Sequence, residues 1–121
     1  MLYSERLPKS PTSAAAARDL LERIREQVSE TVLDDARLLV SELVANAVEH
    51  VREEGDIEVR VALQDSVLRI EVLDPGPGFE YVPRGADAGS GDRGWGLAFA
   101  DRLARRWAND RGRVWFELDR S

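Results

Sequence analysis

The hydrophobic pattern of the chain changes from a helical to an alternating period at about residue 57. Before that point, apolar residues recur at helical spacing over residues 14–28, and Thr12 or Ser13 can cap this first helix. A second helix is predicted from Thr31 to about Arg52, with a capping-box-like start in which Asp replaces Glu or Gln. The first half of the chain therefore predicts two consecutive helices.

After residue 57, apolar and polar residues alternate in two neighbouring segments. This alternation over 57–63 and 68–73, around a turn at Gln64-Asp65-Ser66, predicts an antiparallel hairpin with one buried face. The remaining predicted elements are short strands over 2–7, 105–110 and 113–119, a loop rich in glycine and proline over 74–93, and a third helix from Gly94 to about Arg106.

These elements predict an α/β (α+β) two-layer sandwich. Its sheet is expected to be mixed and largely antiparallel, with the helices on one face, because alternating strands bury one side only. A doubly wound parallel sheet would need strands with near-continuous apolar runs. The length of 121 residues predicts one domain, residues 1–121.

The composition and charge of the chain argue against several classes of function. The net charge of −6 argues against direct nucleic-acid binding, which depends on clustered cations. The absence of cysteine excludes disulfides and thiolate metal sites, and the sequence has no apolar run long enough for a membrane span. The N-terminus lacks the pattern of a signal peptide. We therefore expect a cytoplasmic location.

Three segments carry candidate chemistry, and the first lies in the second helix. Glu42, Asn46 and His50 are spaced by four and share one helical face. One interpretation is an ordinary solvated face. The other is a ligand position, because Asn is a poor helix former, its amide oxygen suits Mg²⁺, and a carboxylate one turn away can act as a base.

The second segment, Asp74-Pro75-Gly76-Pro77-Gly78, directly follows a predicted strand. Taken alone it fits a plain turn, and the alternative is a site where the Asp74 carboxylate accepts a hydrogen bond from an exocyclic amine beside a flat ring. The third segment, residues 89–97, opens a helix with glycines, where free N–H groups can bind phosphate. It is neither a Walker A loop nor a Rossmann fingerprint.

Taken together and in this order, the three segments resemble the boxes of the GHKL (Bergerat-fold) ATPases. Glu42-x-x-x-Asn46 is similar to the N box, Asp74-x-Gly76-x-Gly78 to the G1 box, and Gly94-x-Gly96 to the G2 box. The resemblance covers almost the whole chain. Within the superfamily, the chain is most similar to stand-alone anti-sigma-factor serine kinases.

The resemblance implies that the chain binds ATP with Mg²⁺ in a Bergerat fold. In this scheme Asn46 coordinates Mg²⁺, Asp74 binds the adenine amino group, and Glu42 is the catalytic base toward a serine hydroxyl. The other implied nucleotide-binding residues are Gly76, Gly78, Arg93, Gly94, Gly96 and Leu97. The implied partners are a sigma factor and a serine-bearing anti-anti-sigma protein, and a homodimer is expected. The alternative is a non-catalytic, nucleotide-gated binding module.

Several features depart from the family pattern or stay open. The predicted lid contains no lysine, so Arg93 is expected to supply the cation. Trp95 stands where the family usually has an aliphatic residue, and it fits either under the lid or in the core. His50 is expected to be structural. Trp115 lies on the strand face opposite Val114 and Phe116, where it fits either a partner contact or packing against neighbouring side chains.

Overall fold

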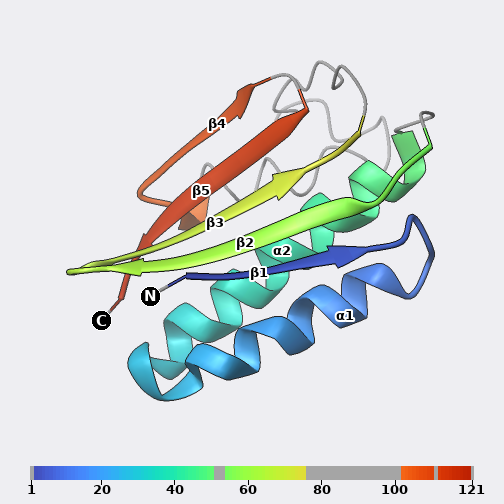
Figure 1. Cartoon of the computed structure of the whole chain (residues 1–121). Helices are drawn as coiled ribbons and strands as arrows, with labels where there is room; N and C mark the ends of the chain where they lie inside the picture. The colour runs from blue at the N-terminus through green and yellow to red at the C-terminus, as the bar shows by residue number, and fades with distance from the viewer. Residues whose placement is uncertain (1, 51–53, 76–101, 111, 121) are drawn as a thin grey trace.

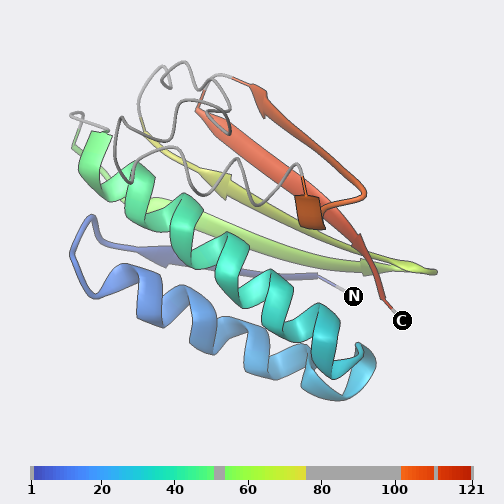
Figure 2. The ribbon, with the colours of Figure 1, turned by 180° about the vertical axis from the view of Figure 1, so that it is seen from behind.

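The computed structural model describes residues 2–50, 54–75, 102–110 and 112–120. This part of the chain forms two layers, a twisted sheet and a layer of helices that covers one of its faces (Figure 1; Figure 2). The predicted Gly-rich boxes after Pro75 lie outside the described residues, as do residues 51–53. None of the described helices is long and apolar enough to cross a membrane.

The sheet has five strands in the order β1-β2-β3-β5-β4, and every neighbouring pair is antiparallel. The strands are β1 (Leu2–Leu7), β2 (Ile57–Gln64), β3 (Val67–Leu73), β4 (Arg106–Asp110) and β5 (Arg113–Asp119). The predicted two-layer α+β architecture is therefore confirmed. The predicted hairpin is also confirmed, and Asp65 has a positive φ of 33° in its turn.

The helical layer contains α1 (Ser13–Leu20), the 3₁₀ helix η1 (Leu21–Gln27) and α2 (Glu30–His50). The single helix predicted over residues 14–28 is therefore an α-helix that tightens into a 3₁₀ helix, as often happens at helix ends. The side chains of Thr12 and Ser13 do not cap α1. The Ser13 hydroxyl donates to the carbonyl oxygen of Pro8, and the Thr12 hydroxyl makes no capping hydrogen bond.

The predicted start of the second helix at Thr31 is wrong by two residues. The backbone N–H of Val32 donates to the hydroxyl of Ser29 at 3.2 Å, and the N–H of Leu33 donates to the carbonyl of Ser29 at 2.9 Å. Ser29 therefore caps α2, and Thr31 lies inside the helix. An extended residue, Val28, precedes the cap and separates η1 from α2.

The predicted third helix extends too far toward the C-terminus. Of its described residues, 102–106, only Arg102 and Leu103 are helical, and Arg106 is already in β4. The reason is pairing with β5, since the backbone N–H of Arg105 donates to the carbonyl of Glu117 at 2.7 Å. The part of this prediction over 94–101 lies outside the described residues.

The core lies between the sheet and the helices. One row of fully buried side chains crosses three strands, with Val61 opposite Ile70 and Ile70 opposite Phe116. On the helical side, buried residues recur along α2, as the helical period predicted. They are Leu33, Ala36, Leu39, Val40, Leu43, Val44 and Ala47.

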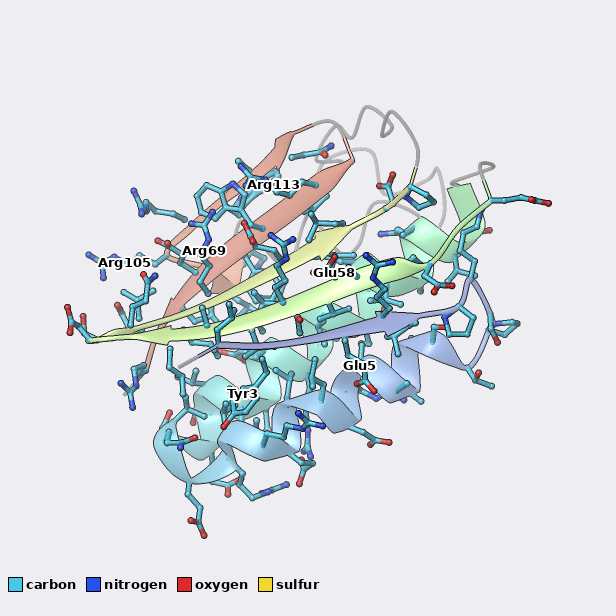
Figure 3. The ribbon with its side chains drawn as sticks, viewed as in Figure 1. Tyr3, Glu5, Glu58, Arg69, Arg105 and Arg113 are labelled. Atoms are coloured by element: carbon cyan, nitrogen blue, oxygen red, sulfur yellow. The ribbon has the colours of Figure 1, made fainter. Side chains whose placement is uncertain are left out.

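The other face of the sheet carries charged side chains, with Glu58, Arg69 and Arg113 pointing away from the helices (Figure 3). The guanidinium of Arg69 lies 4.1 Å from the ring centroid of Trp115 and donates to Glu117 at 2.9 Å. Of the two alternatives for Trp115, packing against neighbouring side chains is the one the structure forms.

Candidate functional site

The candidate site is built on one side of α2. Asn46 is nine residues after Arg37, which places it about 180° around the helix at ~100° per residue. Arg37 pairs with Glu22 of η1, so it marks the side of α2 that faces the other helices. Asp35, Glu42 and Asn46 are spaced by seven and four and lie on the opposite side. We call these three residues the α2 flank.

Asn46 has an unusual environment for an asparagine. Its side chain is 5% exposed, and its Nδ2 atom has no hydrogen-bond partner among the described residues. A buried amide without a partner costs about 1–3 kcal/mol and requires an explanation in a native structure. The amide nitrogen is a hydrogen-bond donor, so an acceptor such as a phosphate oxygen of a bound nucleotide would supply the missing partner.

The amide of Asn46 fits the Mg²⁺ role that the resemblance implies. Its oxygen is a hard ligand of the kind that Mg²⁺ takes. No group of three or more His, Cys, Asp or Glu side chains able to hold a metal occurs in the described part of the chain. Mg²⁺ is usually held by one or two protein groups together with the phosphates of a nucleotide, so one amide ligand is enough for the implied role.

Glu42 lies one helical turn before Asn46. Its side chain is half-buried, and burial raises the pKa of its carboxyl above the ordinary value. None of the described arginines or lysines forms an ion pair with it. A carboxylate with a raised pKa is a better proton acceptor near neutral pH than an ordinary one. The position and the environment of Glu42 therefore both suit a general base.

Asp74 directly follows β3 and is half-buried. Its backbone N–H donates to the carbonyl oxygen of Gly112 at 2.8 Å, which ties the end of β3 to the β4–β5 turn. The C-terminal ends of α2 and β3 lie at the same end of the molecule (Figure 1; Figure 2). The structure therefore brings Asp74 to the end of the sheet where the helix that carries Glu42 and Asn46 also ends.

Six predicted site residues lie outside the described residues, namely Gly76, Gly78, Arg93, Gly94, Gly96 and Leu97. Trp95 lies outside them too, as does the side chain of His50. Their nucleotide-binding and structural roles stay predictions.

Sequence reasoning missed two residues near the site. Asp35 is half-buried on the α2 flank, and its spacing of seven from Glu42 was the available signal. Gly55 lies against Pro75, because a Cβ atom at position 55 would be 2.9 Å from the Cβ of Pro75. An isolated glycine between a helix and a strand was the signal for this close approach.

A separate hollow of about 430 Å³ lies at the other end of the sheet, beside the β2–β3 turn. There the guanidinium of Arg120 donates to the carbonyl oxygens of Gln27 and Asp65. These bonds connect the residue that follows β5 to η1 and to the β2–β3 turn. None of the described residues that line the hollow belongs to the predicted site.

Comparisons with known proteins concern the family and the fold. Residues 7–114 match the histidine kinase-like ATPase domain family. The fold is similar to the crystal structure of the RsbU and RsbW domains of Rv1364c from Mycobacterium tuberculosis, with a TM-score of 0.69 and 25% identity. That match covers 98% of this chain and 31% of the other. A comparison with curated proteins gave no match. Since the family match spans most of the chain, including Glu42, Asn46 and Asp74, the chain belongs to the histidine kinase-like ATPase domain family.

Proposed function

We propose that this protein is an anti-sigma regulatory factor that binds Mg·ATP and phosphorylates a serine of an anti-anti-sigma partner. The observation that carries the proposal is the position of two residues on the same side of α2. Glu42 is half-buried, and Asn46 is buried with an amide nitrogen that has no partner among the described residues. The likeness to a structure that contains an RsbW domain supports the regulatory assignment.

In this proposal, a specific residue makes each contact with Mg²⁺ and the nucleotide. Asn46 holds Mg²⁺, which would neutralise phosphate charge, and Asp74 accepts a hydrogen bond from the adenine amino group. Gly76 and Gly78 shape the adenine pocket. Phosphate contacts come from Arg93, Gly94, Gly96 and Leu97.

The chemical step needs one proton acceptor. The serine Oγ forms a bond to the γ-phosphorus as the bond from that phosphorus to the bridging oxygen of ATP breaks, which gives phosphoserine and ADP. Glu42 takes the hydroxyl proton. Positioning and charge neutralisation supply most of the rate acceleration in reactions of this class. The raised pKa of Glu42 suits this role, because it brings the pKa of the base closer to neutral pH.

The proposed partners are a sigma factor, which the protein sequesters, and its serine-bearing antagonist. A homodimer is part of the proposal. Leu2, 65% exposed on the edge strand β1, supports it as an apolar contact group. Trp115 gives the homodimer weaker support than its place on the open face of the sheet suggested, because the side chains of Arg69 and Arg106 lie over its ring.

Two measurements test the proposal. Calorimetric titration with ADP and Mg²⁺ should show binding, and a lack of heat together with an unchanged melting temperature would contradict nucleotide binding. Labelled ATP should then transfer its phosphate to the cognate serine-bearing antagonist, and Glu42→Ala should abolish the transfer. Tight nucleotide binding without transfer would favour the non-catalytic, nucleotide-gated module instead.

A further inference from the structure

Asp74 is joined to the sheet by one further step of the β3–β5 ladder. The antiparallel register pairs Leu73 with Arg113, so the next pair in the same register is Asp74 with Gly112. The backbone N–H of Asp74 fills this position, because it donates to the carbonyl oxygen of Gly112 at 2.8 Å. Pro75 follows and has no N–H to donate to the ladder. The carbonyl of Gly112 therefore fixes the backbone of Asp74 just before the chain continues into the predicted G1 box.

Gly112 has a backbone conformation on which this bond depends. It lies in the turn between β4 and β5, next to the pair of Asp110 with Arg113, and has a φ of 73°. Glycine adopts positive φ without steric cost, and Asn adopts it far more readily than a β-branched residue does. A residue confined to negative φ would have to rotate about its N–Cα bond, and this rotation would carry the carbonyl oxygen away from the N–H of Asp74.

The strand that follows Gly112 is held firmly against β3. Val114 is paired with Val72, and both side chains are buried in the core. On the open face, the guanidinium of Arg113 donates to the carboxylate of Glu71 at 3.3 Å. Because contacts on both faces of the sheet hold this part of β5, the direction of the Gly112 carbonyl depends on the conformation of Gly112 itself.

We infer that Gly112 is a positioning residue of the nucleotide site, because its carbonyl oxygen holds the Asp74 carboxylate in place for the adenine amino group. The Asp74 side chain starts from a Cα whose own N–H is fixed by this bond, so a displaced carbonyl moves the carboxylate. Hydrogen bonds weaken when the distance or the angle leaves a narrow range. This inference rests on the proposed role of Asp74 and adds that recognition of the amino group depends on the β4–β5 turn.

The test compares the binding of two nucleotides to the full-length protein by calorimetry in the presence of Mg²⁺. One is ADP, and the other is purine riboside diphosphate, which lacks only the amino group of the base. The ratio of the two affinities measures the amino-group contact, because a loss of folded protein weakens the binding of both nucleotides alike. We expect the unaltered protein to bind ADP about tenfold to a hundredfold more tightly, the range of one hydrogen bond to a charged group.

Two substitutions of Gly112 separate its conformation from added bulk. Gly112→Val disfavours positive φ and should lower the ratio to below about threefold, whereas Gly112→Asn adds a side chain of similar size, tolerates positive φ and should keep most of the ratio. Gly112→Ala, which strains the same φ less, provides the comparison if the valine variant does not fold.

Asp65→Val is the matched control. Asp65 also has a positive φ, of 33°, but it lies in the β2–β3 turn at the opposite end of β3 from Asp74. The control should therefore destabilise the protein as a turn substitution does and leave the ratio of the two affinities unchanged.

The outcomes separate this inference from the proposed function. Equal binding of the two nucleotides by the unaltered protein, or a ratio that survives Asp74→Ala, contradicts the adenine role of Asp74 and overturns the inference with it. A ratio that depends on Asp74 but survives Gly112→Val, or that falls equally in Gly112→Asn, overturns only the positioning role of Gly112. Hydrogen exchange of the Asp74 amide in the nucleotide-free protein should be slow in the unaltered protein and faster in Gly112→Val, and equal exchange would also overturn that role.

Discussion

Gly55 and Pro75 lie in direct contact, although 20 residues separate them along the chain. A Cβ atom at position 55 would be 2.9 Å from the Cβ of Pro75, and Gly55 has a φ of +131° that side-chain-bearing residues rarely adopt. The turn between α2 and β2 therefore supports the residue that follows Asp74.

Gly55→Ala should lower the free energy of unfolding by about 1–3 kcal/mol, because it adds both backbone strain and the overlap with Pro75. It should also weaken ADP binding, since a shift of Pro75 moves Asp74. Urea denaturation and calorimetry measure the two effects. Asp56→Ala, at the exposed next residue, is the control and should change stability by less than about 0.5 kcal/mol. Unaltered stability of Gly55→Ala would contradict the close contact.

Asn46→Ala should weaken Mg²⁺-dependent nucleotide binding without destabilising the fold. The substitution removes a buried amide that lacks a partner and adds a good helix former, so the melting temperature should stay the same or rise. The Mg²⁺-dependent part of ADP affinity should fall by at least about tenfold, equivalent to ~1.4 kcal/mol. Leu43→Ala is the contrasting variant, because it empties a buried core position and should cost about 2–5 kcal/mol. A large loss of stability in Asn46→Ala would show that the amide is structural.

Glu42→Gln should abolish phosphate transfer and stabilise the nucleotide-free protein. The pKa of Glu42 is raised in the folded state, so its ionised form disfavours folding once the pH exceeds the ordinary carboxyl pKa of about 4.3. The gain in melting temperature should therefore be present at pH 7 and vanish near pH 4. Glu54→Gln, at an exposed position, provides the control in the same thermal scans. A Glu42→Gln protein less stable than the unaltered one at pH 7 would show that the carboxylate has a favourable partner.

Glu117 should give the opposite pH dependence. Burial on its own would raise the pKa of this carboxyl, but hydrogen bonds from Arg106 at 2.7 Å and Arg69 at 2.9 Å outweigh burial and lower it. Its contribution to stability is therefore complete above the ordinary pKa of about 4.3 and is lost as the pH falls through the lower folded value.

Glu117→Gln should accordingly cost about 1–3 kcal/mol at pH 7, and the difference from the unaltered protein should shrink below about pH 4. Urea denaturation at a series of pH values measures it. Asp119→Asn is the matched control, because the pair of Asp119 with Arg105 is exposed and should contribute under about 1 kcal/mol. A difference that does not change between pH 7 and pH 3 would refute the assignment to ionised Glu117.

Much of this fold follows from local pattern. The alternation in β2 and β3 predicted which residues face the helices, because the side-chain period of a strand is two whatever its neighbours are. The helical period of α2 likewise placed Glu42 and Asn46 on one side. The start of α2 was predicted wrongly, since Thr31 and Ser29 are both plausible caps and only backbone geometry selects Ser29.

The sequence by itself determined the element types, the face that each strand buries, and the order of the candidate binding segments, all of which depend on near neighbours along the chain. Only the tertiary structure decided that Trp115 lies beneath Arg69, that Gly55 contacts Pro75, and that Asn46 is buried with an unpartnered amide nitrogen. Each of these depends on strand register or on packing between distant segments, and those contacts are set by the burial of the whole core rather than by any local pattern.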